Sequence, residues 1–279
     1  MLRRFAVALA AVVLLLPFPV MTQKAGRPTI LLPPDQTVAV ITLDFRGGYG
    51  PPRRDDRPML TIFPNGVVRI VDGSGEVAPI EAKISADALQ ELLRFAIDEH
   101  HFLDFDNLAA SQQLRAEEDK SGLRHTIIDA STTVIRIRTS ERDHTEEFYA
   151  LRDYLEVYPS VKLLQDLYAV EERLLKLSYE IEAGGEEGIA AALKLANEFL
   201  RKTYPKVPLL VPADFLYTRR YSPDRRRLVF VRKAAVRKET ETDPAARVQM
   251  LLFPEPTFSV MVEYTTGNTP KVMVENPTQ

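Results

Sequence analysis

The largest group of side chains suited to binding an anion lies between residues 219 and 238. Its members are Arg219, Arg220, Arg225, Arg226, Arg227, Arg232, Lys233, Arg237 and Lys238. Clustered guanidinium and ammonium groups attract an anionic partner, such as an envelope polymer, a lipid head group or an acidic protein. The same charges are typical of the solvated face and turn of a hairpin, where they hinder pairing between exposed strands. If the run binds a ligand, we expect the contacts from Arg219, Arg220, Arg225, Arg226 and Arg227.

A glycine-rich stretch offers a second place for an anion. The sequence Arg46-Gly47-Gly48-Tyr49-Gly50 is followed by Arg53 and Arg54. Backbone N–H groups of such a loop can surround an anion. A phosphate-binding loop, however, opens a helix and ends in Lys-Ser or Lys-Thr, whereas this one follows a predicted strand and has neither feature. A flexible loop between strands is the simpler interpretation, and Tyr49, Arg53 and Arg54 are kept as binding candidates.

A third set of polar residues has the chemistry of metal ligands. It comprises Asp98, Glu99, His100, His101, Asp104 and Asp106. Imidazole nitrogens and carboxylate oxygens suit zinc or another divalent ion. Helical metal motifs place two histidines four residues apart, whereas adjacent histidines diverge by about 100° on a helix. The pattern therefore favours a solvated helix end. We predict no metal and no other cofactor, and name His100, His101, Asp104 and Asp106 as the candidates for a metal test.

Catalytic motifs are missing from the chain. It has no cysteine, which excludes disulfides and thiolate chemistry, and it has four histidines. Neither a Gly-x-Ser-x-Gly elbow nor a Ser-x-x-Lys pair occurs. Catalytic groups are recognised by geometry rather than by spacing, so an enzyme is not excluded. The sequence favours a protein that is not an enzyme.

Composition and the N-terminal stretch indicate the cellular location and the class of partner. The 279 residues carry a net charge of -3, which gives no overall field for nucleic acid. Arg3 and Arg4 precede an apolar run over residues 5–16 that is shorter than the ~20 residues of a membrane span. We therefore predict a signal peptide over residues 1–25, a mature chain without a transmembrane span, and a periplasmic or extracellular location. Residues 26–36 form a proline-containing extended leader.

One long helix is expected to organise the rest, over residues 160–182. Its apolar stripe consists of Leu163, Leu167, Val170, Leu174, Leu177 and Ile181. Ser160 is the expected N-cap, and Gly184-Gly185 the stop. The stripe could be a dimer seam, but Leu164, Tyr168 and Leu175 widen it, which favours the core face of a helix lying on a sheet.

The pattern predicts an α+β fold with two units, each a helix packed on an antiparallel sheet. In the unit 37–183, strands are expected at 38–45, 59–63, 67–71, 77–84, 126–130, 133–139 and 145–151. Asn65-Gly66 predicts a hairpin, Ser85 caps a helix that ends near His100, and residues 109–124 are a loop or an exposed helical turn. In the unit 186–275, a helix at 189–200 precedes strands at 215–221, 228–235, 248–253, 258–264 and 271–274.

Two resemblances accompany these patterns. The stretch 38–150 resembles uncharacterised domains of exported bacterial proteins. The resemblance lies in residues 59–71 and 85–105, which include His101-Phe102-Leu103-Asp104-Phe105. Residues 186–275 are similar in outline to cystatin-like or PepSY-like modules, in which a helix lies on a sheet. Such modules are usually binding or inhibitory, although a likeness of fold does not assign a function.

The function expected from the sequence is an exported, non-enzymatic binding protein of the bacterial cell envelope or extracellular space. A protein or an anionic envelope polymer is the expected class of partner, and nucleic acid is not. The alternative is a secreted hydrolase with its site in a cleft between the two units.

Overall fold

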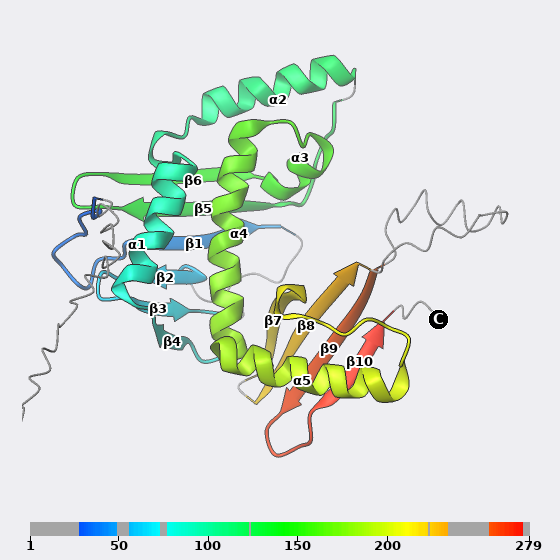
Figure 1. Ribbon diagram of the computed structural model, residues 1–279. Helices are drawn as coiled ribbons and strands as arrows, with labels where there is room; N and C mark the ends of the chain where they lie inside the picture. Colours follow the sequence, from blue (N-terminus) through cyan, green and yellow to red (C-terminus); the bar gives the residue numbers. More distant parts are fainter. Residues whose placement is uncertain are drawn as a thin grey trace, which may run out of the picture.

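Two antiparallel sheets and the helices packed on them make up an α+β fold (Figure 1), as the sequence predicted. The computed structural model describes residues 28–48, 56–72, 77–122, 124–222, 224–233 and 257–275. The predicted signal peptide over residues 1–25 lies outside the described residues. No helix in the described part of the chain is long and apolar enough to cross a membrane.

The first sheet has six strands in the order β4-β3-β2-β1-β5-β6. They are β1 (Ile41–Gly47), β2 (Leu60–Ile62), β3 (Val67–Ile70), β4 (Ile80–Lys83), β5 (Ser131–Arg138) and β6 (Asp143–Tyr149). The predicted Asn65-Gly66 hairpin joins β2 to β3, where Ile62 pairs with Val68. Gly66 has a φ of +78°, and a Cβ there would lie 2.4 Å from the Ile84 oxygen. Only glycine fits this turn without strain.

Helices cover one face of this sheet. Ser85 caps α1 (Ala86–Arg94) as predicted, with its hydroxyl accepting from the Ala88 N–H at 3.1 Å. A π-helical turn, η1 (Phe95–Glu99), and a 3₁₀ turn, η2 (Phe102–Asp104), follow. Leu89, Leu93 and Phe102 are fully buried under them. The apolar faces of these short elements close the core of the first sheet.

Two sequence predictions in this region differ from the structure, and one helix was not predicted. Residues 109–124 belong mostly to a helix, α2 (Asn107–Ser121), which Asp106 caps by accepting from the N–H groups of Leu108 and Ala109. Only Ala110 and Leu114 of this helix are buried, so its amphipathic signal is weak. The strand predicted at residues 126–130 is also wrong, because these residues form no strand and β5 begins at Ser131. The short helix α3 (Leu151–Val157) was not expected.

The long helix α4 (Lys162–Ala183) follows α3 and ends at Gly184, which has a φ of +93°. Its N-cap is Val161, without a side-chain hydrogen bond, so the predicted Ser160 cap was wrong. Leu164, Leu167, Val170, Leu174 and Leu175 are buried within this single chain. The stripe is therefore the core face of the helix, as favoured over a dimer seam.

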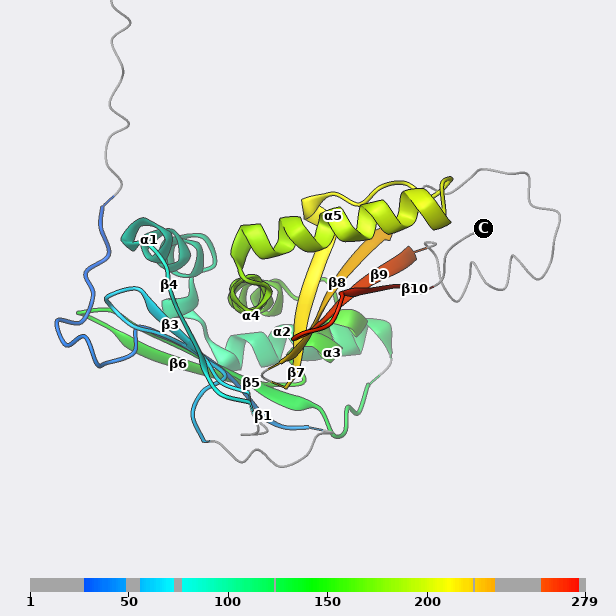
Figure 2. The same cartoon turned by 90° about the horizontal axis from the view of Figure 1, so that it is seen from below.

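The second sheet is a four-stranded meander in the order β10-β9-β8-β7. Its strands are β7 (Phe215–Ser222), β8 (Arg225–Lys233), β9 (Thr257–Thr265) and β10 (Lys271–Glu275). The helix α5 (Gly185–Thr203) covers one face (Figure 2), and a short turn, η3 (Pro212–Asp214), precedes β7. The core here consists of Ala192, Ala196, Leu200, Leu228, Phe230, Val260 and Val262, among others. The strand expected at 248–253 lies outside the described residues.

The C-terminal part of α4 contacts the second sheet as well as the first. The Thr218 hydroxyl of β7 donates to the main-chain oxygen of Tyr179 at 3.0 Å. The rings of Tyr179 and Tyr217 lie 6.1 Å apart. Figure 2 shows α4 end-on, between α1 and β7. This helix therefore sets the position of the β7–β8 hairpin relative to the first sheet.

Candidate functional site

The β7–β8 hairpin arranges the predicted arginines in cross-strand pairs. Arg219 pairs with Arg227, and Arg220 pairs with Arg226. Because side chains alternate along a strand, the first pair and the second pair lie on opposite faces of the sheet. Arg225 lies at the beginning of β8, next to the turn. The run that the sequence presented as one basic patch is therefore two groups on two faces.

The outer group surrounds Tyr221, and we call Tyr221, Arg219, Arg225 and Arg227 the Tyr221 cluster. The three guanidinium carbons lie 5.3, 5.1 and 5.3 Å from the centre of the ring. Glu263 of β9 accepts hydrogen bonds from Arg225 at 3.0 Å and Arg227 at 2.8 Å, and these bonds lower its pKa. Three cations share one aromatic ring and one carboxylate, so the cluster keeps an excess of positive charge.

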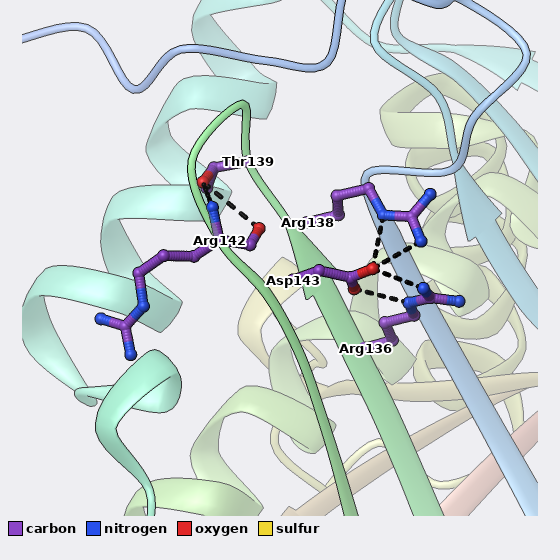
Figure 3. Close-up of polar contacts among 5 residues, drawn as sticks. All are labelled: Arg136, Arg138, Thr139, Arg142 and Asp143. Carbon is purple, nitrogen blue, oxygen red and sulfur yellow. Dashed lines mark hydrogen bonds and ion pairs between the residues drawn. The ribbon is translucent and has the colours of Figure 1, made fainter.

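A second arginine cluster in the chain has one carboxylate for two guanidinium groups. In the β5–β6 hairpin, Asp143 accepts from both nitrogen atoms of the Arg136 fork at 2.7 and 2.5 Å (Figure 3). It also accepts from Arg138 at 2.9 and 2.5 Å, and both arginines hold the pKa of Asp143 well below its usual range. Arg225 and Arg227 are bonded to Glu263 in the same way, whereas Arg219 lies over the Tyr221 ring and, among the described residues, is not hydrogen-bonded to a carboxylate. The Tyr221 cluster has one carboxylate for three.

The inner pair faces a pocket of about 400 Å³, which we call the inter-sheet pocket. Its lining includes Ile80 of β4, Glu182 of α4, Arg220 of β7, Arg226 of β8, and Tyr264 and Thr265 of β9. The pocket therefore lies where the edge of the first sheet, the C-terminal end of α4 and the second sheet meet. The position agrees with Figure 1, in which the end of α4 lies between β4 and the second sheet.

Main-chain oxygens, rather than carboxylates, position these two arginines. Arg226 donates to the Glu182 oxygen at 3.0 Å, and its guanidinium carbon lies 5.3 Å from the centre of the Tyr264 ring. Arg220 donates to the Ala78 oxygen at 3.2 Å. Among the described residues, neither guanidinium is hydrogen-bonded to a carboxylate. Both positive charges are held at the pocket without being neutralised by a direct ion pair.

Two further groups in the pocket are chemically distinctive. Burial raises the pKa of Glu182 to about 7; Arg220 opposes this shift and Asp72 adds to it. Burial also raises the pKa of Tyr264, and within the described part of the chain its buried hydroxyl has no hydrogen-bond partner. Glu182 therefore changes charge near neutral pH, and Tyr264 keeps an unused donor.

The residues considered for a metal do not form a site. His100, His101, Asp104 and Asp106 have separate roles. The Nδ1 atom of His100 lies 2.9 Å from Asp166, and Asp104 pairs with Arg142 at 2.9 Å. His101 is exposed in the left-handed region, with a φ of +50°, while Asp106 caps α2. Over the described ranges, no group of three histidine or acidic residues could hold a metal ion.

Other sequence-predicted residues can be placed only in part. Tyr49, Arg53 and Arg54 lie outside the described residues, as do Arg237 and Lys238. Arg232 lies 3.8 Å from Asp214, across from η3 and away from the Tyr221 cluster. The structure therefore brings the five hairpin arginines together with residues of α4 and β9, and leaves the glycine-rich loop as a sequence prediction.

A second pocket, of about 360 Å³, is lined by two serines, Ser121 and Ser160, by a histidine and by a carboxylate. Ser160 hydrogen-bonds to Glu117, which lowers the pKa of Glu117 together with the stronger bond from Lys120. The ring of His125 contacts the ring of Tyr158 edge-on, with 5.8 Å between centres. Among the described residues, no hydrogen bond joins Ser160 to His125. Ser160 and His125 therefore do not form the activated pair of a serine hydrolase.

Comparisons with protein-family models, curated proteins and solved structures gave no match to this chain. The resemblances of 38–150 to domains of exported proteins, and of 186–275 to cystatin-like or PepSY-like modules, therefore stay predictions. The site has to be interpreted from its own residues.

Sequence reasoning did not identify Tyr221, Tyr264, Glu182 or Glu263 as parts of the site. Tyr221 had a usable signal, because it lies two residues after Arg219 on a strand and so shares its face. Glu182 and Tyr264 are far from the arginines in the sequence and had no local signal. Their positions depend on how α4 and β9 pack against the hairpin.

Proposed function

We propose that this chain is an exported, non-catalytic binding protein of the bacterial cell envelope or extracellular space, and that its Tyr221 cluster contacts an anionic polymer. The observation that carries the proposal is the grouping of Arg219, Arg225 and Arg227 around one exposed ring with a single carboxylate, Glu263. A row of cations on the outer face of a sheet suits repeated negative charges along a chain better than one buried anion.

The export part of the proposal rests on residues 1–25, whose two arginines and short apolar run are typical of a signal peptide. Fractionation of cells that produce the full chain, followed by N-terminal sequencing, tests it. A mature chain that begins near residue 26 in the periplasm or medium supports export. Retention of the whole chain in the cytoplasm contradicts it.

Polymer binding is tested by retention of the purified chain on immobilised dextran sulfate, with elution by salt. We expect Arg219→Gln/Arg227→Gln to elute at clearly lower salt, because two charges of the cluster are removed. Glu263 keeps Arg225 as a partner in this variant. The matched control is Arg201→Gln/Lys202→Gln, which removes two exposed charges from α5. Equal elution of the two variants, or no retention of the unmodified chain at low salt, would contradict the proposal.

The alternative function, a secreted hydrolase with a cleft between the two units, has one observation in its favour. Glu182 lies in the inter-sheet pocket with a pKa of about 7, the range in which a carboxyl acts as general acid or base at neutral pH. Incubation of the chain with acidic polysaccharides and measurement of released reducing ends tests it. Hydrolysis that Glu182→Gln abolishes would establish the enzyme and overturn the binding proposal.

A further inference from the structure

The inter-sheet pocket has the size and the polar lining of a binding site for a small ligand, and it is separate from the Tyr221 cluster. It lies on the side of the β7–β8 hairpin opposite to Tyr221 and Arg219. Its volume of about 400 Å³ is much larger than an isolated ion and suits a ligand of the size of a sugar. The volume therefore suits a ligand with a carbon framework better than a single ion.

The charged lining favours an anion. Arg220 and Arg226 each use one nitrogen for a main-chain oxygen and have further N–H donors. Arg225 also borders the pocket, and so does Asp224, whose carboxylate accepts a hydrogen bond from Ser222 at 2.5 Å. The guanidinium of Arg225 is bonded to Glu263, so Arg220 and Arg226 supply the positive charge that faces Asp224 and a partly ionised Glu182, and among the described residues neither is hydrogen-bonded to a carboxylate. Planar guanidinium groups match the geometry of a carboxylate.

The uncharged lining favours a ligand that carries hydroxyl groups. Tyr264 has a buried hydroxyl without a partner among the described residues, and Thr265 adds a second hydroxyl. Ile80 adds an apolar side chain to the lining. A sugar ring offers hydroxyls to such donors and acceptors and apolar C–H faces to aliphatic and aromatic side chains.

We propose that the inter-sheet pocket binds a sugar that carries a carboxylate, with the carboxylate on Arg220 and Arg226 and a ring hydroxyl on Tyr264. This site goes beyond the proposed polymer contact, because it uses the opposite face of the hairpin. A monoanion is favoured over a phosphate dianion because Glu182 and Asp224 also face the pocket, and each ionised carboxylate opposes a second negative charge on the ligand.

The pocket also makes binding dependent on pH. The charges of Arg220 and Asp72 act on the Glu182 carboxyl. Arg226 donates to the main-chain oxygen of Glu182, and Asp224 and Tyr264 line the same pocket. Below about pH 7 Glu182 takes up a proton, which removes a like charge from beside the ligand carboxylate. A sugar carboxylate stays ionised over this range. Affinity therefore increases as the pH falls from 8 to 6.

The test is calorimetric titration of the full chain with sodium glucuronate, and with glucose and inorganic phosphate as comparison probes. We expect Arg220→Gln to weaken glucuronate binding by about tenfold or more, through the loss of a charge-assisted contact. Tyr264→Phe, which removes only the unpartnered hydroxyl, is expected to weaken it by about threefold to tenfold. The matched control is Arg219→Gln, the same change one residue away on the opposite face, with less than about a twofold effect.

The pH arm uses Glu182→Gln, which is expected to bind equally at pH 6 and pH 8. Three results would overturn the proposal: glucose binding as tightly as glucuronate, phosphate binding more tightly, or equal losses in Arg219→Gln and Arg220→Gln. Absence of saturable glucuronate binding by the unmodified chain would do the same. The polymer proposal is tested independently by Arg219→Gln/Arg227→Gln, because these two substitutions change no residue of the pocket lining.

Discussion

Arg226 donates a hydrogen bond to the main-chain oxygen of Glu182, 3.0 Å away, and so joins β8 to the C-terminal end of α4. The last carbonyl groups of a helix have no partner within the helix, and they carry its negative dipole end. A guanidinium satisfies both requirements. The same contact holds Arg226 at the inter-sheet pocket, so one residue stabilises the joint and charges the site.

Removing this contact should weaken the joint. We expect Arg226→Met to lower the free energy of unfolding by about 1–2 kcal/mol, because the helix end loses a partner while the aliphatic packing is kept. Urea denaturation followed by circular dichroism measures the change. Arg219→Met, exposed on the opposite face, is the control and should change stability by ~0.5 kcal/mol or less. Equal effects of the two substitutions would show that the contact is not stabilising.

Glu146 on β6 should make stability depend on pH. Its side chain is 5% exposed and lies 2.6 Å from the Nε2 atom of His144. Burial raises the pKa of Glu146 to about 7; Asp106 adds to the shift and a hydrogen bond from Asn107 opposes it. The raised pKa means that folding favours the protonated form. Its stabilising contribution is complete below about pH 4.5 and is lost as the pH rises through about 7.

The variant Glu146→Gln removes this titration. The difference in unfolding free energy between the variant and the unmodified chain should shift in favour of the variant by about 1–3 kcal/mol when the pH is raised from 5 to 8. Chemical denaturation at the two pH values measures the difference. The control is Glu147→Gln, a neighbouring residue whose 2.8 Å pair with Arg46 is exposed and should matter little at either pH. A pH-independent effect of Glu146→Gln would contradict the buried protonated carboxyl.

Asp143 should give the stability a pH dependence of the opposite sign to that of Glu146. Hydrogen bonds from Arg136 and then Arg138 lower its pKa, so its stabilising contribution is present above the ordinary pKa of 3.8 and is lost as the pH falls further. At pH 7, Asp143→Asn should cost about 1 kcal/mol, a value limited by solvent screening of this partly exposed group. The cost should shrink near pH 2. Thermal unfolding at the two pH values measures the cost. The control is Glu81→Gln, which removes an exposed ion pair with Arg69.

Gly66 tests the β2–β3 turn. Gly66→Ala combines the strain of a positive φ with a clash at the Ile84 oxygen, and should cost about 2–4 kcal/mol. Gly122→Ala is a matched control: its φ is +68°, and a Cβ there meets no atom within 4 Å. It should cost about 1 kcal/mol from backbone strain alone. Similar losses for both variants would show that the contact with Ile84 relaxes freely.

Local patterns predicted the elements whose signals lie within a few residues. The Asn65-Gly66 turn, the Ser85 cap and the Gly184 stop follow from backbone preferences that need no distant partner. The prediction failed for α2, because most of its residues face solvent and the cap at Asp106 is its main signal. It failed at Ser160 because the hydroxyl bonds to Glu117, which is distant in the sequence.

For the candidate site, the sequence predicted a hairpin with five arginines and presented them as one basic patch. The register of β7 and β8 divides these arginines between two faces, and the packing of distant elements sets the neighbours of each face. Packing of α4 against both sheets brings Glu182 and the edge of β4 to Arg220 and Arg226, while β9 brings Glu263 and Tyr264 to the two faces. Burial and neighbouring charge set the pKa of Glu182, and both depend on contacts between residues far apart in the chain.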